Sequence, residues 1–351
     1  MTFAKRIAAA VSAVALTATM GVAVDGSADA KPVRWDMQST YPGSLTQLGT
    51  LGKRIDSQIA LVSDGEIRIT FQEPGAIVPA LEVFDAVANG AVDAGWSTPG
   101  YWAGKVPALQ LFAAVPFGPA APEYLAWFYF GGGKALFEEI YAKHGIFSEM
   151  CGVIAPEASG WFRKEIKSPE DLKGLKMRFF GLGAKVMEKM GVSTQLLAGG
   201  DIYPALELGT IDATEFSMPA IDLKLGFYQV AGHYYFPGWH QQSTMFDLMM
   251  NKEAYDELTD VQKAQIASVC GDSIRFGLVE GEAIQFAALQ ELQEKGVEIH
   301  KWPPEMLAEF EKAWKAVVAE QEKDPEFKKV WDSLTAFRDN YATWRDLGYL
   351  N

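Results

Sequence analysis

The chain has 351 residues, of which 49% are hydrophobic and 22% are charged, and its formal net charge is −14. This length exceeds one typical hydrophobic core and suits two domains. The negative charge disfavours nucleic acid and anionic membrane surfaces, because both require a basic face, but one or two arginines in a pocket can still bind a small anion.

The first thirty residues predict a signal peptide. Lys5 and Arg6 form a positive start, an apolar run covers residues 7–24, and residues 28–30 read Ala-Asp-Ala, the small-x-small pattern of a cleavage site. A membrane anchor is the alternative, but the run is short and rich in Ala and Thr for a span. We therefore expect residues 1–30 to be removed on export and the protein to act in the periplasm.

Two α/β units follow in chain order. The predicted elements of the first unit are strand 33–40, helix 45–65, strand 66–71, helix 79–89 and strand 91–97. Those of the second are strand 160–164, a short helix after Ser168, strand 174–180, helix 183–190, strand 193–198, helix 202–208 and strand 210–216. This alternation is typical of mostly parallel sheets covered by helices.

One stretch occurs in both units. The sequence from Ala88 and the sequence from Glu207 share a helix end, a glycine, an apolar residue and Asp-Ala, and Trp96 then falls on Glu215. Ligands of open parallel sheets bind beyond the carboxyl ends of the strands, so Trp96, Glu215 and Phe216 are expected to line a cleft between two lobes. The alternative is that the repeat only packs helix on strand and that Trp96 belongs to the core.

The remaining elements predict a discontinuous fold. A strand at 245–251 precedes a long helix at 260–296 and helical sequence at 306–341 that breaks near Pro325. We expect a two-lobed α/β protein with a hinged cleft and long C-terminal helices. Its predicted parts are lobe I, residues 31–152 plus about 242–285; lobe II, residues 153–241 plus part of 286–351; and a C-terminal helical region, residues 305–345.

One arginine and the two cysteines are further candidates for a functional or structural role. Arg178 lies among Met and Phe at a strand end, which favours a carboxylate or phosphate partner over a solvated side chain. Cys151 and Cys270 can either form a disulfide or be buried as small hydrophobes. No zinc site is expected, because there is no CxxC and the four histidines lack ligand spacing.

The motifs at residues 160–178, 199–216 and 234–240 (GWFRKEIKSPEDLKGLKMR, GGDIYPALELGTIDATEF and YYFPGWH) resemble the solute-binding proteins of TRAP transporters. The resemblance is greatest to the subfamily that binds 2-oxo and 2-hydroxy acids together with a metal ion. It implies a periplasmic binding-protein fold of type II-like architecture, no enzymatic activity, TRAP membrane subunits as partners, and a homodimer formed through the C-terminal helices.

The resemblance also implies residue roles. Arg178 matches the arginine that pairs with the ligand carboxylate, Glu215 matches a cation ligand, and Phe216 matches a position whose backbone carbonyl ligates. Glu157 and Gln241 stand where family members often carry Gln and Glu. Two carboxylates remain after this exchange, so a sodium or calcium ion held by Glu157, Glu215, Phe216 and Gln241 is expected. The implied ligand-binding set is Arg178, Glu157, Phe216, Trp96, Tyr101 and Gln241.

Other positions bear on specificity and assembly. Tyr101 is expected to close over the ligand, and His240 is expected to be structural. Apolar residues where polar ones are common predict a roomier pocket and a bulkier acid: Val153, Ile154, Ala220 and Ile221. An apolar stripe is expected either to form the dimer interface or to cover the chain's own lobes: Met306, Leu307, Phe310, Trp314, Val317 and Val318.

Two other functions compete with transport. An exported hydrolase would use Glu157 and Glu215 as acid and base, but no GxSxG, HExxH or Cys/His arrangement accompanies them. A two-lobed sensory binding protein would have the same ligand site and a different membrane partner.

Overall fold

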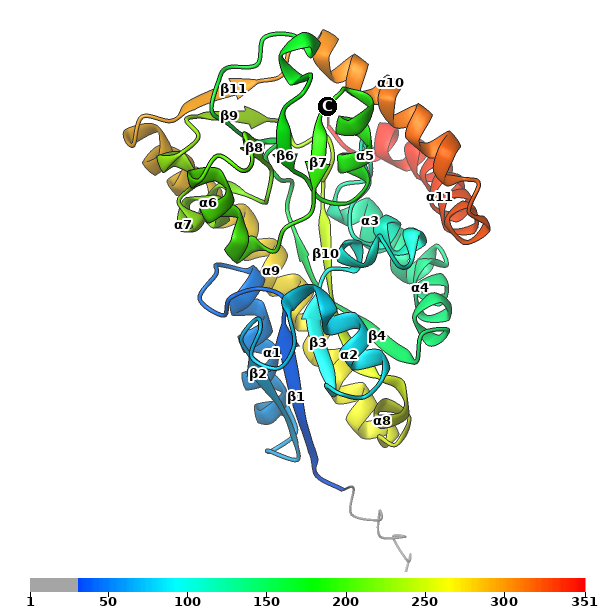
Figure 1. Cartoon of the computed structure of the whole chain (residues 1–351). Coiled ribbons are helices and arrows are strands. Elements are labelled where there is room, and N and C mark those ends of the chain that lie inside the picture. The colour runs from blue at the N-terminus through cyan, green and yellow to red at the C-terminus, as the bar shows by residue number, and fades with distance from the viewer. Residues whose placement is uncertain (1–30, 351) are drawn as a thin grey trace, which may run out of the picture. The chain divides into compact units, whose positions relative to one another are not determined.

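The computed structural model contains two β-sheets, and chain segments run between them (Figure 1). The structure describes residues 31–350, so the predicted signal peptide lies outside the described residues. The strands are β1 Val33–Ser39, β2 Ile67–Gln72, β3 Ala94–Ser97, β4 Ile146–Ile154, β5 Gly160–Phe162, β6 Lys176–Arg178, β7 Ser193–Gln195, β8 Ala213–Thr214, β9 His233–Phe236, β10 Thr244–Asn251 and β11 Glu298–Lys301. The helices are α1 Leu48–Val62, α2 Val83–Ala88, α3 Ala121–Phe130, α4 Gly133–Ala142, α5 Gly181–Lys189, α6 Gly199–Glu207, α7 Pro219–Leu225, α8 Lys252–Asp256, α9 Asp260–Glu294, α10 Pro304–Gln321 and α11 Pro325–Gly348.

The first lobe is built on the sheet β2-β1-β3-β10-β4. β1 lies parallel to β2 and β3, whereas β10 is antiparallel to both β3 and β4. In β1, buried Val33, Trp35 and Met37 alternate with exposed residues, and in α1 the buried positions recur at helical spacing. None of the helices between residues 31 and 350 combines the length and apolar character that a membrane crossing requires.

The second lobe is built on the sheet β11-β9-β5-β8-β6-β7. β6 is parallel to both β7 and β8, and β5 is antiparallel to β8 and β9. The short helix expected after Ser168 is a 3₁₀ turn, Pro169–Leu172, and the Asp171 carboxylate accepts the Ser168 backbone N–H in a capping box. The chain passes to this lobe between β4 and β5 and returns to the first sheet between β9 and β10.

The repeated stretch serves the same structural purpose in each lobe. Gly90 and Gly209 both follow a helix with positive φ, 75° and 72°, a conformation that favours glycine. The carboxylates of Asp93 and Asp212 each accept a backbone N–H from the neighbouring parallel strand, β1 or β6, at 2.9 Å. The shared glycine and aspartate therefore end a helix and fix the next strand, as the packing alternative proposed.

A disulfide between Cys151 and Cys270 joins β4 to α9, which resolves the question that the sequence left open. α9 packs on α1 and β4 of the first lobe and on α7, which follows β8 of the second. This 35-residue helix therefore runs along both lobes (Figure 1). The disulfide attaches it covalently to the strand that leaves the first lobe.

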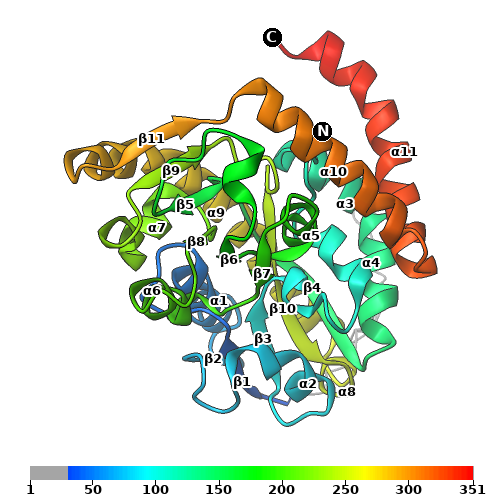
Figure 2. The same cartoon turned by 45° about the horizontal axis from the view of Figure 1, so that its top comes forward.

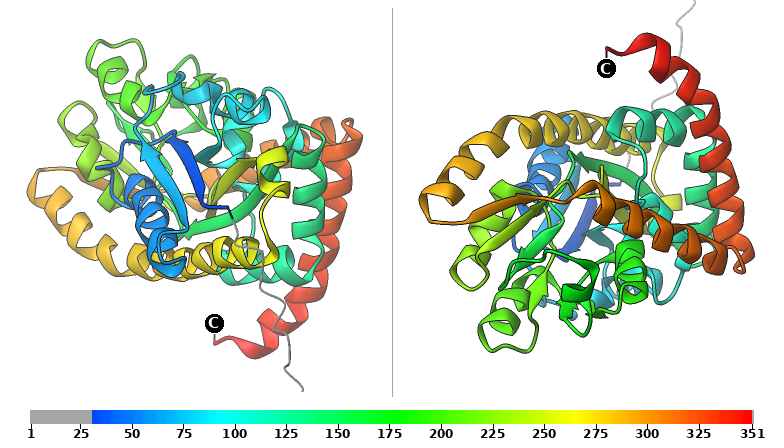
Figure 3. Two further views of the ribbon diagram at one scale, coloured as in Figure 1. Left: turned by 90° about the horizontal axis from the view of Figure 1, so that it is seen from below. Right: turned by 90° about the horizontal axis from the view of Figure 1, so that it is seen from above.

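The C-terminal helices cover the chain's own surface. α10 packs on α5, and α11 packs on α3 and α4, beside which it runs in Figure 3. Four members of the predicted apolar stripe are buried within the chain: Met306, Phe310, Trp314 and Val317. The stripe therefore covers the chain's own lobes, which is the second of the two predicted alternatives. The end of α11 projects from the rest of the described fold (Figure 2), and Trp344 and Leu347 there are 60% and 83% exposed.

Candidate functional site

A cavity with about 20 Å³ of space for the centre of a water-sized sphere lies between the two lobes. Its walls come from both sheets and from the segments that join them: Tyr41, Leu48, Thr98, Tyr101, Glu157, Arg178, Phe180, Phe216, Ser217, Gln241, Thr244 and Phe246. Sites for drug-sized molecules occupy roughly 300–1,000 Å³. A cavity below that range suits a ligand of a few heavy atoms.

Arg178 and Glu215 form a buried ion pair at one wall. Nη1 of Arg178, which ends β6, lies 2.9 Å from Glu215 Oε1 and also donates to the Glu215 backbone carbonyl, while its Nε donates to the carbonyl of Leu197. The Phe216 ring lies 5.1 Å from the guanidinium carbon. These hydrogen bonds fix the guanidinium plane and leave Nη2 without a protein partner among the described residues.

Glu157, Thr244 and Gln241 form a second buried network. Thr244 Oγ1 donates to Glu157 Oε1 at 3.0 Å and accepts from Gln241 Nε2 at 2.8 Å. Because the hydroxyl has only one proton, which it gives to the carboxylate, it must accept from the amide nitrogen. This arrangement leaves Gln241 Oε1 and Glu157 Oε2 buried without hydrogen-bond partners.

His240 completes a cluster with the two carboxylates. Ligand atoms of Glu157, Glu215 and His240 all lie within 4.8 Å of one another, and all three residues are buried. Glu215 Oε2 has no hydrogen-bond partner and lies 3.9 Å from His240 Nε2; neither ring nitrogen of His240 has such a partner. The sequence suggested a structural role for His240, but the structure places it in the acidic cluster.

The two carboxylates occupy different electrostatic environments. Burial raises the pKa of Glu157 well above its usual range, and the nearby Glu215 carboxylate raises it further. Burial also acts to raise the pKa of Glu215, but Arg178 and His240 outweigh it and lower that pKa. Charge on Glu157 is therefore unfavourable in the protein alone and needs either a proton or a cation beside it.

The orphaned atoms provide a test of whether a cation fits. The unpartnered oxygens of Glu157, Glu215 and Gln241 belong to the carboxylate and amide groups that sodium and calcium prefer. Buried polar atoms are nearly always partnered in native proteins, so several orphans in one place indicate a missing ligand. Among the described residues, no backbone N–H donates to the Phe216 carbonyl, the fourth predicted ligand. The donor set therefore fits a hard cation.

Tyr101 and Gly100 bring the first lobe into contact with the second. Tyr101 follows β3 in a 3₁₀ turn, and its ring meets the Phe180 ring edge-on at 5.4 Å. A Cβ at Gly100 would lie only 2.2 Å from Phe180 Cζ. This close approach requires glycine, and both Tyr101 and Phe180 line the cavity.

Trp96 lies behind the cavity wall instead of in it. It is completely buried, its indole N–H donates to the Leu48 carbonyl, and its ring packs 5.8 Å from that of Phe246. Leu48 and Phe246 do line the cavity. Trp96 thus supports the wall, whereas its counterpart in the repeat, Glu215, carries the ion pair.

The residues expected to widen the pocket do not reach it. Val153 and Ile154 are buried in β4, Ala220 and Ile221 are buried in α7, and none of the four lines the cavity. The argument for a bulkier ligand therefore fails, because the side chains on which it relied face other parts of the core.

Sequence reasoning missed several wall residues: Tyr41, Thr98, Phe180, Ser217, Thr244 and Phe246. Ser217 directly follows Phe216 after the second repeat, and Thr98 directly follows β3 after the first. Extending each predicted strand end by one residue would have found both. Thr244 gives no comparable signal, because its role depends on meeting a residue 87 positions away.

Comparison with known protein families gives one extensive match. The family described as bacterial extracellular solute-binding protein, family 7 (DctP), matches residues 39–324. A Nostoc protein named monocarboxylate 2-oxoacid-binding periplasmic protein is 36% identical over 321 residues, which cover 91% of this chain and 88% of that protein.

Solved structures show the same similarity. A TRAP transporter solute-binding protein of Bordetella bronchiseptica, described as a mixed occupancy dimer with calcium and picolinate, is 35% identical with a TM-score of 0.88; the match covers 90% of this chain and 94% of that one. A TRAP periplasmic solute-binding protein of Pseudoalteromonas atlantica, with bound sodium and pyruvate, is 33% identical with a TM-score of 0.87; coverage is 91% and 97%.

Proposed function

Because the chain belongs to the bacterial extracellular solute-binding protein family 7, we propose that it is the receptor of a TRAP transporter and binds a small 2-oxo or 2-hydroxy monocarboxylate with a sodium or calcium ion. The observation that carries the proposal is the convergence of buried, unpartnered carboxylate and amide oxygens beside an arginine in a small cavity. The family comprises binding proteins, which removes the hydrolase alternative.

Arg178 recognises the ligand carboxylate. Its other hydrogen bonds hold the guanidinium in place, and its free Nη2 provides a charge-assisted donor at the cavity wall. Tyr101 of the first lobe also lines the cavity. The cavity size favours pyruvate or lactate over acids with long side chains.

Glu157, Glu215, Gln241 and the Phe216 carbonyl hold the cation. A bound cation supplies the positive charge that lets two carboxylates and an anionic ligand share one buried site. The protein contributes a ligand set that hydrogen bonds from Thr244 and Arg178 orient in advance. Because these side chains are already ordered, they lose less conformational entropy when the cation and the ligand bind.

The principal test is calorimetric titration of purified protein with pyruvate, lactate and 2-oxobutyrate, using succinate as the dicarboxylate control. Titrations are run after chelation, with sodium alone and with calcium alone. We expect tight monocarboxylate binding that needs one of the cations. Equal affinity for all acids, or binding that ignores every cation, would contradict the proposal.

Exchange of two ligands tests the cation model directly. Glu157→Gln removes one carboxylate and should weaken cation binding, whereas Glu157→Gln with Gln241→Glu restores the number of carboxylates and should recover it. Ligand affinity is measured against calcium concentration in the wild type and both variants. A double variant that binds calcium more weakly than the single variant would rule out this arrangement.

The export route and assembly belong to the same proposal. We infer a periplasmic protein that delivers its ligand to TRAP membrane subunits and forms a homodimer. The exposed apolar end of α11, with Trp344 and Leu347, is better suited to the dimer interface than the buried stripe of α10. Light scattering of wild type and a Trp344→Ser, Leu347→Ser variant tests this, and a monomeric wild type at micromolar concentration would refute it.

A further inference from the structure

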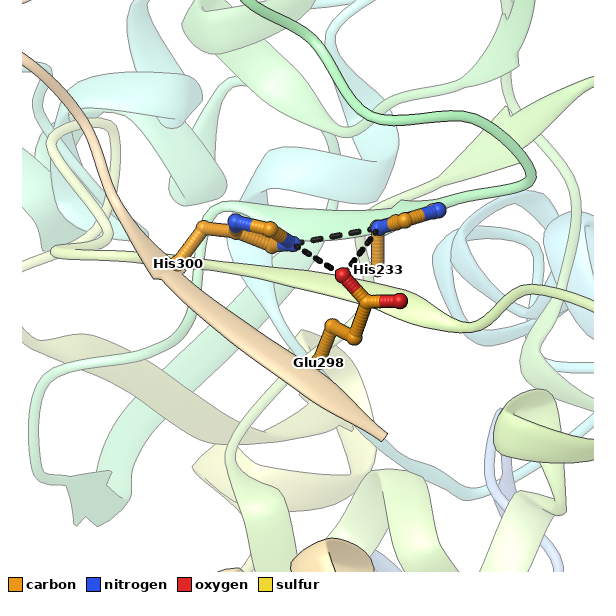
Figure 4. Close-up of side chains that lie close together, drawn as sticks. All are labelled: His233, Glu298 and His300. Atoms are coloured by element: carbon orange, nitrogen blue, oxygen red, sulfur yellow. Dashed lines mark hydrogen bonds and ion pairs between the residues drawn. The ribbon is translucent and has the colours of Figure 1, made fainter. Parts of the chain in front are cut away.

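A second group of potential metal ligands lies far along the sheet from the central cavity. His233 of β9 and His300 and Glu298 of β11 point toward one another in Figure 4. His233 Nδ1 lies 3.1 Å from His300 Nε2 and 3.6 Å from Glu298 Oε2, and His300 Nε2 lies 3.8 Å from the same carboxylate oxygen. Three potential ligand atoms thus converge from two strands.

The strand register explains this convergence. β11 is the edge strand of the second sheet and pairs in parallel with β9, with Glu298 opposite His233. His300 is two residues beyond Glu298 and therefore on the same face. Sequence spacing gave no sign of a site, because the two histidines are 67 residues apart. Two of the chain's four histidines nevertheless meet here.

The distances match a tetrahedral transition metal. Zinc bonds to nitrogen and oxygen of about 2.0–2.2 Å place neighbouring ligand atoms about 3.3–3.6 Å apart in a tetrahedron. The observed separations of 3.1, 3.6 and 3.8 Å bracket these values. Two imidazoles and one carboxylate are also a known ligand set for zinc, with a fourth position for water.

Aromatic packing holds one imidazole in position. His300 stacks on Tyr235 with 4.6 Å between ring centroids, and Tyr235 stacks in turn on Trp302 at 4.2 Å. The Tyr235 hydroxyl accepts the backbone N–H of Ile166. His300 is therefore oriented by the core beneath it, while the Glu298 side chain is 66% exposed and free to adjust to an ion.

We propose that His233, Glu298 and His300 form a binding site for a borderline divalent metal such as Zn²⁺, separate from the central hard-cation site. Imidazole nitrogens suit zinc, copper and nickel better than they suit sodium or calcium. The ion joins edge strand β11 to β9, and β9 leads directly into the segment that carries His240 and Gln241. Metal binding therefore stabilises the edge of the second lobe.

The test is calorimetric titration of untagged protein with zinc chloride alone. His233→Ala and His300→Ala should each weaken zinc binding by roughly tenfold or more, since each removes one of three protein ligands. His144→Ala is the matched control, because His144 packs against Phe84 of the first lobe. His240→Ala reports on zinc that enters the central cluster instead.

Cobalt substitution gives a second readout. Tetrahedral Co²⁺ bound at this site should produce visible absorption in the wild type and in His144→Ala, and this absorption should be absent in His300→Ala. Circular dichroism confirms that each variant is folded. The proposal is overturned if the wild type does not bind zinc, or if His240→Ala abolishes binding while His300→Ala leaves it unchanged. In either case the contact between His233 and His300 is only a hydrogen bond.

Discussion

Replacement of Arg178 should affect both stability and ligand binding, and the structure separates the two effects. Arg178 is 1% exposed and its partner Glu215 is 0% exposed. Removing one member of a buried ion pair typically costs about 3–5 kcal/mol, because the remaining charge loses its compensation. Arg178→Ala should therefore lower the free energy of unfolding by about that amount.

A second substitution isolates the electrostatic cost. In Arg178→Ala with Glu215→Gln the uncompensated carboxylate is gone, while an amide oxygen can still accept the Phe180 N–H that Glu215 accepts in the wild type. The double variant should be more stable than Arg178→Ala, despite carrying one more change. Arg178→Lys keeps the charge and loses the planar fork, so its stability should lie between those of the wild type and Arg178→Ala.

Ligand binding provides the independent readout. Loss of one partner of a buried, hydrogen-bonded charge pair costs about 2–5 kcal/mol, which corresponds to roughly 30- to 5,000-fold in affinity. Urea unfolding measures stability, and pyruvate titration in calcium measures binding. If Arg178→Ala binds pyruvate within threefold of the wild type, Arg178 does not recognise the carboxylate. If the double variant is less stable than the single one, the ion-pair argument is wrong.

Three further predictions follow from individual contacts. Gly100→Ala inserts a Cβ into the aromatic ring that faces it and should lower the free energy of unfolding by about 1–3 kcal/mol, whereas Gly104→Ala, with nothing within 4 Å, should leave it unchanged in the same urea titration. Replacing Cys151 and Cys270 together by Ala should lower stability in urea by about 2–5 kcal/mol, and added reductant should then have no effect on the variant. Burial raises the pKa of Asp247 to about 7, so the folded protein binds its proton more tightly; this contribution to stability is full below about pH 3.8 and is lost as pH rises towards 7. Asp247→Asn should remove this contribution, which changes the free energy of unfolding by up to about 1.4 kcal/mol per pH unit. If thermal unfolding has the same pH profile in the wild type and the variant, the pH dependence does not come from Asp247.

The spacing of apolar residues in the sequence predicted those helices and strands that bury only one face. α1 shows its helical spacing in the sequence, and β1 alternates because only one side of it is packed. β4 was not predicted, because it is buried along almost its whole length and therefore has no period of two. β9 and β11 are four residues each, too short for a pattern to stand out from the neighbouring aromatic residues.

The family resemblance is confirmed, and the chemistry at the site was predictable only in part. Motifs identified Glu157, Arg178 and Gln241 individually, and the cavity contains all three. Their relations were not accessible, since the Arg178–Glu215 pair spans 37 positions and the Glu157–Thr244 bond spans 87. Neither local propensity nor spacing carries information over such separations.

The repeated stretch shows how the two lobes come to differ. The carboxylates of Asp93 and Asp212 accept the same kind of backbone hydrogen bond from a neighbouring strand, so the two repeats have the same local structure up to that residue. Three positions later the first lobe has Trp96, which fills the core, and the second has Glu215, which binds Arg178. A charged carboxylate in the core needs a compensating charge, so Glu215 and the arginine at the end of β6 depend on each other. The first lobe contributes uncharged wall residues, and the second contributes Arg178 and the charges around it.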